Sequence, residues 1–269
     1  YLGALNAFNA YQPKFVEVPT DNGGLIPEEL DKILETTPNC KFIYVIPDFQ
    51  NPTGRTWSME RRQKFMEVVN KHNLPVLEDN PYGELRYEGT ILPSLKSMDT
   101  KGLVMFLGTF SKIFCPGLRL GWIAAEHSLL SEFVKIKQSA DLHTSNFDQG
   151  VADAYMEQYD LDEHVKEIVA LYKHRRDLIL ESMEKYFPAG TEWTHPEGGL
   201  FLWLTFPEGV SARKVFNKCI EMKVAGVIGD AFYPNQKTDR SMRINYSNMP
   251  DDRIVEGIQR MAKAIKECM

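Results

Sequence analysis

Cysteine is scarce in this sequence of 269 residues, and no two cysteines form a C-x-x-C pair. The four lie far apart, at Cys40, Cys115, Cys219 and Cys268. This spacing excludes a disulfide framework and a cysteine-based zinc site, so we expect reduced thiols. The six histidines also lack an H-E-x-x-H or similar spacing, and we therefore expect no metal site.

The sequence also lacks long apolar runs and an excess of positive charge. No segment reaches the ~20 apolar residues of a membrane span, and no charged-then-apolar leader opens the chain at Tyr1. The formal net charge is -6, and we interpret the short run His174–Asp177 as the solvated face of a mixed-charge helix. Because nucleic-acid binding needs clustered lysine and arginine, we expect neither a membrane nor a nucleic-acid partner, and a cytoplasmic location.

Short β-rich apolar runs alternate with helical patterns in the first half of the chain. Helices are predicted at residues 26–35 and 58–72, where Pro27 and Ser58 are typical of a helix start. Strands are predicted in the runs that begin at Phe15, Lys41, Leu74, Leu103 and Leu120. This order predicts an α/β fold with a mostly parallel sheet and flanking helices.

The second half has a different character. Long helical patterns begin at Asn146 and end near Pro188, and one of them is long enough to bridge two domains. Shorter strands and two further helices follow, which predict a smaller α+β unit. We therefore predict a major domain over residues 1–157, and a bridging helix with a small C-terminal domain over residues 158–269.

Polar side chains follow three of the predicted strands. In open parallel sheets, ligands bind beyond the carboxyl ends of the strands, so these side chains are expected to meet at one rim. They comprise an amide, a carboxylate, a phenol, two hydroxyls and an amine, from Asn51, Asp79, Tyr82, Thr109, Ser111 and Lys112.

The lysine and the carboxylate suggest an aldehyde cofactor. A lysine held at such a rim can form a Schiff base with an aldehyde if its surroundings keep part of it unprotonated. A pyridine nitrogen that must stay protonated needs an anionic partner, and Asp79 fits that role. Lys112 and Asp79 together therefore indicate pyridoxal 5'-phosphate (PLP).

The remaining polar groups fit the other parts of PLP. Asn51 and Tyr82 can donate hydrogen bonds to the phenolic oxygen of the cofactor. A phosphate arm would bind hydroxyls and an arginine, and the lysine loop offers Thr109, Ser111 and Arg119.

Four motifs occur in a familiar order: N-P-T-G at Asn51–Gly54, D-x-x-Y at Asp79–Tyr82, S-K-x-x-x-P-G-x-R-x-G at Ser111–Gly121, and M-R-I-N-Y-S around Arg243. In these motifs the chain resembles the class I and II aminotransferases of PLP fold type I. It is most similar to the subgroup of 2-aminoadipate and multisubstrate aminotransferases, and to the aminotransferase-like domains of MocR-type regulators.

The resemblance implies a role for each matching residue. Lys112 would carry PLP as a Schiff base and move the proton at the substrate alpha carbon, while Asn51 and Arg243 would bind the substrate. The enzyme would transfer an amino group from an L-amino acid to a 2-oxo acid, as a homodimer. The resemblance also implies roughly a hundred or more further residues upstream of Tyr1. It leaves open whether residues 1–269 are active alone.

Other interpretations stay open at this point. Asn51 can simply open an Asn-Pro turn, Arg119 can pair with a surface carboxylate, and Arg243 can lie on the exposed face of an edge strand. Two alternative functions keep the cofactor: a MocR-type effector domain that senses PLP without turnover, and a PLP-dependent beta-lyase or decarboxylase.

Overall fold

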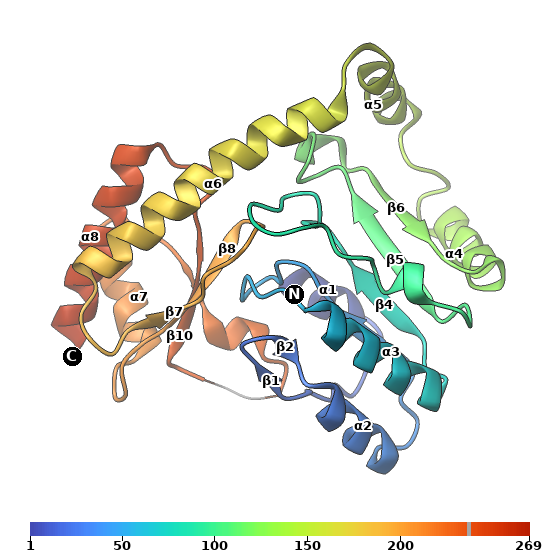
Figure 1. The fold of residues 1–269 in the computed structure, drawn as a ribbon, viewed down its shortest axis with the longest axis horizontal. Coiled ribbons are helices and arrows are strands. Elements are labelled where there is room, and N and C mark those ends of the chain that lie inside the picture. The colour runs from blue at the N-terminus through green and yellow to red at the C-terminus, as the bar shows by residue number, and fades with distance from the viewer. Residues whose placement is uncertain (236–237) are drawn as a thin grey trace. The chain divides into compact units, whose positions relative to one another are not determined.

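The computed structural model describes residues 1–235 and 238–269 (Figure 1). It contains two compact units. Unit 1 comprises Tyr1–Glu17, Phe49–Arg55 and Ala170–Met269, and unit 2 comprises Val18–Asp48 and Thr56–Val169. The division expected between residues 157 and 158 stays a prediction.

Unit 2 is built on a four-stranded sheet, with strand order β3-β4-β5-β6. The strands β3 (Ile43–Val45), β4 (Val76–Asp79) and β5 (Val104–Thr109) are parallel, and β6 (Gly121–Ala124) pairs with β5 in the antiparallel direction. The expected mostly parallel sheet is therefore confirmed. A short hairpin of β1 (Thr20–Asp21) and β2 (Gly24–Leu25) precedes it.

Two helices, α2 (Pro27–Thr36) and α3 (Met59–His72), pack on one face of this sheet. The sequence signals act as expected, because Pro27 opens α2 and the Ser58 hydroxyl accepts a hydrogen bond from the Arg61 N–H at the start of α3. The helices and strands bury a common core that includes Leu30, Ile43, Val45, Phe65, Val69, Val76 and Val104.

The two faces of β4 carry different chemistry. Val76 and Glu78 point to the core, while the alternate residues Leu77 and Asp79 point to the opposite face. Glu78 is fully buried, and its carboxylate accepts hydrogen bonds of 2.8 Å from the backbone N–H groups of Leu95 and Lys96. Glu78 therefore fastens the following loop to the sheet, and Asp79 is left for the other face.

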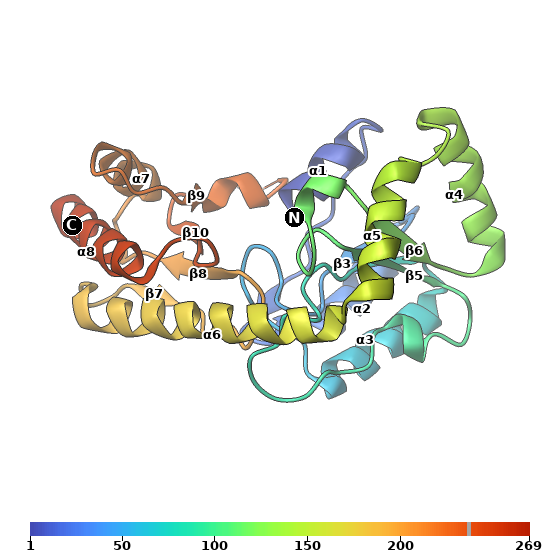
Figure 2. The ribbon, with the colours of Figure 1, turned by 90° about the horizontal axis from the view of Figure 1, so that it is seen from above.

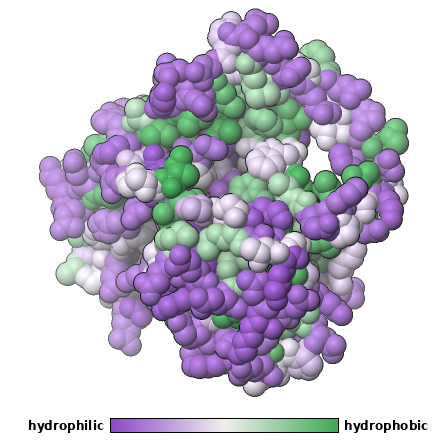
Figure 3. Space-filling view, turned by 45° about the vertical axis from the view of Figure 1, so that its right-hand side comes forward, coloured by the Kyte–Doolittle hydropathy of each residue, from purple (hydrophilic) through white to green (hydrophobic). Residues whose placement is uncertain are grey.

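Three longer helices complete the middle of the chain: α4 (His127–Ala140), α5 (Asn146–Gln158) and α6 (Leu161–Tyr186). The expected helices from Asn146 to near Pro188 are thus present, and Ser145 caps α5. On α4 and α5 many large apolar side chains are exposed, among them Val134, Ile136, Phe147, Val151 and Met156. Hydrophobic residues lie among hydrophilic ones on the face drawn in Figure 3.

Unit 1 contains an antiparallel sheet with strand order β7-β8-β10-β9. Its strands are β7 (Glu192–Trp193), β8 (Phe201–Thr205), β9 (Val227–Ile228) and β10 (Ser241–Asn245). Its helices are α1 (Leu2–Asn9), the part of α6 from Ala170 onward, α7 (Ala212–Glu221) and α8 (Asp251–Cys268), and α7 lies beside α8 (Figure 2). This is the expected α+β unit.

Some local expectations are wrong. Phe15–Val18 forms no strand, because the Phe15 carbonyl and the Glu17 carboxylate accept hydrogen bonds from Asn235 instead of from a neighbouring strand. The run His174–Asp177 is not a solvated face throughout, since Arg176 is 4% exposed and donates to the Pro196 carbonyl. Among the described residues, no helix combines the length and the apolar character that a bilayer crossing requires.

Candidate functional site

Asp79 is the last residue of β4 and lies partly buried at the carboxyl end of the strand. Its Oδ2 accepts a hydrogen bond of 2.5 Å from the hydroxyl of Tyr44, the middle residue of β3. Burial raises the pKa of the Asp79 carboxyl above its ordinary value, and the hydrogen bond from Tyr44 opposes part of that rise. The site thus contains a carboxylate that a cationic partner would stabilise.

Lys112 lies in the turn that follows β5, the neighbour of β4. In the sheet register Asp79 pairs with Leu107, so Thr109, Ser111 and Lys112 follow at the same edge of the sheet as Asp79. The backbone N–H of Ser111 donates to the Thr109 hydroxyl, which in turn donates to the Leu120 carbonyl. These bonds tie the partly buried lysine turn to the start of β6.

Arg119 closes the same loop. Its backbone has a positive φ of 56°, which is uncommon outside glycine, and its guanidinium donates to the Pro116 carbonyl at 3.1 Å. The side chain is exposed and forms no described ion pair. The proposed pairing with a surface carboxylate is therefore not seen within the described residues, and Arg119 stays a candidate phosphate ligand.

Tyr82 lies in the turn after β4 and is 3% exposed. The turn is closed by two bonds, from the Gly83 N–H to the Asn80 side chain and from the Leu85 N–H to the Tyr82 carbonyl. Asp79 and Tyr82 are thus held by one strand end, as the D-x-x-Y spacing predicts.

Asn51 and Arg243 belong to unit 1, where they form a direct pair. Nη1 of Arg243 donates a hydrogen bond of 2.8 Å to Oδ1 of Asn51, which is 3% exposed. Arg243 lies on β10, which is an interior strand of its sheet, so the edge-strand alternative is wrong. The Asn51–Pro52 bond is cis. Asn51 does lie in a turn, and it also contacts Arg243, so both interpretations of this residue apply.

Two aromatic rings flank the Arg243 guanidinium. Its central carbon lies 4.2 Å from the ring centre of Phe201 on β8 and 5.2 Å from that of Phe232. The Phe232 ring in turn meets Trp203 edge-on, with ring centres 5.7 Å apart. Arg243 is therefore held by cation–π contacts as well as by Asn51.

Sequence reasoning missed Tyr44, Phe201 and Phe232. Phe201 is buried in the core of unit 1, and its ring also contacts the arginine. Tyr44 lies in the interior of β3, whereas the prediction of the site rests on residues at the strand ends. The period-2 pattern could have found it, because Tyr44 alternates with the buried Ile43 and Val45 and so points to the face of Asp79.

The residues of unit 2 fit PLP. Asp79 forms no ion pair with a described lysine, arginine or histidine side chain and can accept a hydrogen bond from a pyridinium. The loop after β5 offers the Lys112 amine and the Ser111 hydroxyl, and Thr109 at the end of β5 carries a second hydroxyl, which donates to the Leu120 carbonyl here and would have to turn toward a phosphate. This donor set matches a ring nitrogen, an aldehyde and a phosphate.

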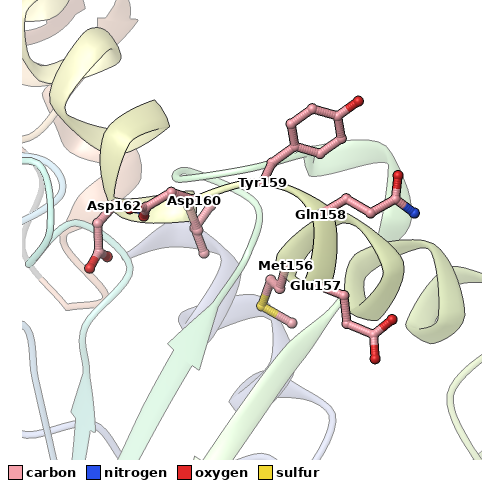
Figure 4. A pocket seen from close by; sticks show the side chains of 7 residues that line it. Met156, Glu157, Gln158, Tyr159, Asp160 and Asp162 are labelled. Carbon is pink, nitrogen blue, oxygen red and sulfur yellow. The ribbon is translucent and has the colours of Figure 1, made fainter.

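A pocket of about 490 Å³ lies elsewhere in unit 2, where α5 ends and α6 begins. It is lined by residues 156–162, whose side chains point in different directions (Figure 4). Three of them are carboxylates, Glu157, Asp160 and Asp162, which do not suit a phosphate. No predicted cofactor-binding residue lines this pocket.

Residues 1–261 match the family model described as aminotransferase class I and II. The chain is 43% identical to aromatic-amino-acid aminotransferase 1 of Thermococcus litoralis, over all of this chain and 66% of that protein. A crystal structure of kynurenine aminotransferase from Pyrococcus horikoshii superposes with a TM-score of 0.95 at 41% identity, over 99% of this chain and 67% of that one. An alpha-aminoadipate aminotransferase from Thermus thermophilus, complexed with N-(5'-phosphopyridoxyl)-L-leucine, superposes with a TM-score of 0.95 at 32% identity, over 100% and 69%.

Proposed function

The chain belongs to the aminotransferase class I and II family, and from that premise we propose that it forms part of an enzyme that transfers an amino group from an L-amino acid to a 2-oxo acid. It spans about two thirds of the length of the relatives it matches. The family match confirms the resemblance seen in the four motifs, and PLP is the cofactor of this family. The similarity to named aminotransferases favours this function over the regulator and lyase alternatives.

Asp79 is the proposed partner of the cofactor ring nitrogen. When bound, PLP supplies an aldehyde for the amino group and a protonated ring that withdraws electrons from the substrate alpha carbon. An ionised Asp79 would keep that ring nitrogen protonated, because an adjacent anion stabilises the charged form. The observation that carries the proposal is that Asp79 ends β4 and Lys112 follows the neighbouring parallel strand β5 at the same edge of the sheet.

Lys112 is the proposed covalent anchor and proton carrier. Its Nζ would hold the cofactor before substrate binds, and would move a proton at the substrate alpha carbon once the substrate amine has replaced it. Thr109, Ser111 and Arg119 would bind the phosphate, and the bonds within their loop support a fixed arrangement. Tyr82 is proposed to donate to the phenolic oxygen of the cofactor.

Arg243 and Asn51 are proposed to bind the substrate. A guanidinium can hold the alpha-carboxylate through two parallel hydrogen bonds, which orients the reacting bonds of the amino acid. Asn51 fixes one end of the guanidinium and is also proposed to reach the cofactor's phenolic oxygen.

We propose amino acids with large side chains, aromatic ones in particular, as substrates. The names of the relatives support this: one is an aromatic-amino-acid aminotransferase, and another acts on kynurenine. Incubating the holoenzyme with 2-oxoglutarate and a panel of amino acids would rank them by kcat/KM. A preference for small aliphatic amino acids over phenylalanine and tyrosine would contradict this choice.

A homodimer in the cytoplasm is the proposed state of the enzyme. The exposed apolar side chains of α4 and α5 support a partner surface, and the four cysteines are free, as a reducing compartment would keep them. Light scattering would measure the mass in solution. A monomer at micromolar concentration would contradict the dimer.

The function is tested by adding PLP and recording the visible absorbance of the bound cofactor. We expect a band in the wild-type protein that Lys112→Ala abolishes, and amino-group transfer that yields a new amino acid. Lys214→Ala, at an exposed position on α7, is the matched control and should keep the band. Ammonia and a 2-oxo acid in place of a new amino acid would indicate a lyase, and a band without turnover would indicate a sensor.

A further inference from the structure

Tyr44 contacts Asp79, the carboxylate that is proposed to bind the cofactor. It is the central residue of β3 and pairs with Leu77 of β4, so its side chain points to the same face of the sheet as that of Asp79. The 2.5 Å between the Tyr44 hydroxyl and Oδ2 of Asp79 lies in the range of hydrogen bonds from a hydroxyl to an ionised carboxylate.

The hydrogen bond from Tyr44 favours the ionised form of Asp79 in its buried surroundings. Among the described residues, Tyr44 is the one that donates a hydrogen bond to the carboxylate. Burial disfavours the ionised form of Asp79, and the hydrogen bond from Tyr44 works against that effect. Without it, the carboxyl would take up a proton more readily and would stabilise a cationic ring less.

We propose that Tyr44 is a positioning residue, which occupies Oδ2 of Asp79 and so leaves Oδ1 to accept the hydrogen bond from the cofactor's ring nitrogen. This inference rests on the proposed function. A phenol suits the task because it stabilises an anion without adding a positive charge that would compete with the pyridinium. It also restricts rotation of the carboxylate about its last side-chain bond, which is otherwise a broad torsion.

Tyr44→Phe tests the proposal, because it removes the hydroxyl and keeps the ring. A hydrogen bond to a charged group contributes free energy that corresponds to about a tenfold change in affinity. We therefore expect the dissociation constant of PLP to be about tenfold higher for the variant than for wild type. A second measurement needs no cofactor: ¹³C NMR titration of the labelled Asp79 carboxyl in the cofactor-free chain. The pKa of Asp79 should be higher in Tyr44→Phe than in wild type.

A double-mutant cycle separates this role from a general loss of stability. Combined with Asp79→Asn, Tyr44→Phe should weaken PLP binding much less than it does alone, because the charge that it serves is gone. Tyr11→Phe, at a position 84% exposed, is the control and should leave the affinity and the titration unchanged.

The outcomes distinguish the two proposals. If wild-type protein shows no cofactor band, the proposed function fails. A normal wild-type band together with an unchanged PLP affinity and an unchanged Asp79 titration in Tyr44→Phe overturns the role of Tyr44 alone. An equal loss of affinity in the Asp79→Asn background also overturns it.

Discussion

Nη1 of Arg243 lies 2.8 Å from Oδ1 of Asn51, although the two residues are 192 positions apart in the sequence. The pair joins an interior strand of the antiparallel sheet to the N-P-T-G turn. Asn51 accepts the hydrogen bond with a carbonyl oxygen, so it orients the guanidinium without neutralising it. An oriented guanidinium of this kind would suit the proposed binding of a substrate carboxylate by Arg243.

Asn51→Ala should raise the KM for the amino acid about tenfold, because a hydrogen bond to a charged group is lost and the guanidinium is less well oriented. Steady-state kinetics over a range of amino acid concentrations would measure it. Asn70→Ala, on α3 and outside the proposed site, should leave the KM unchanged. An unaltered KM in Asn51→Ala would show that Arg243 is positioned by other contacts.

Phe201→Leu should raise the KM about threefold to tenfold, since a cation–π contact to Arg243 is removed. Phe206→Leu is the matched control, because Phe206 is also buried in unit 1 and is not among the rings that contact the guanidinium. Both variants should lower the melting temperature. Only Phe201→Leu should change the KM, and equal kinetic effects would contradict the role of the ring.

Gly54→Ala should destabilise the protein by about 2–4 kcal/mol. Gly54 has a φ of +71°, and an added Cβ would lie 2.5 Å from the Phe201 carbonyl oxygen. Gly209→Ala provides the comparison, because its φ is +83° and nothing lies within 4 Å of the added carbon, so it should cost only about 1–2 kcal/mol. Urea unfolding would measure both, and equal costs would rule out the steric contribution.

Asp79→Asn should stabilise the cofactor-free chain at neutral pH while it weakens PLP binding. Burial raises the pKa of Asp79 in the folded state above the unfolded value of 3.8, so the folded chain binds the proton more tightly. Ionisation therefore costs stability as the pH rises through the folded pKa, and that cost disappears below pH 3.8. Thermal unfolding of both proteins between pH 3 and pH 8 would test this, and a stability difference that does not depend on pH would contradict it.

The sequence predicts elements whose signals are local. Pro27 and Ser58 mark helix starts, and the apolar runs before Asp79 and Thr109 form the expected strands. Helix α4 was not predicted, because none of its residues is buried and its apolar pattern gives little signal. Phe15–Val18 has the composition of a strand but finds no strand partner, which only the tertiary structure decides.

The features of the candidate site also fall into some that the sequence could predict and some that it could not. The placement of Asp79, Tyr82 and Lys112 at one edge of the sheet was predictable, because they follow the apolar runs of neighbouring strands. The contacts of Asp79 with Tyr44 and of Arg243 with Phe201 depend on strand order and register. Those are set by packing between segments, so motif spacing does not contain them.

The register of β4 determines where two adjacent carboxylates lie, and each of them depends on it. Glu78 and Asp79 face opposite sides of the sheet, one bound to backbone amides and one to a phenol. A shift of β4 by a single residue would exchange the two sides. It would drive the shorter acid into the apolar interior, out of reach of Leu95 and Lys96, and would present the longer one to the proposed cofactor site. The same error would thus remove an anchor of the fold and the proposed partner of the cofactor ring, so any sequence change that loosens this alignment should be harmful on both counts.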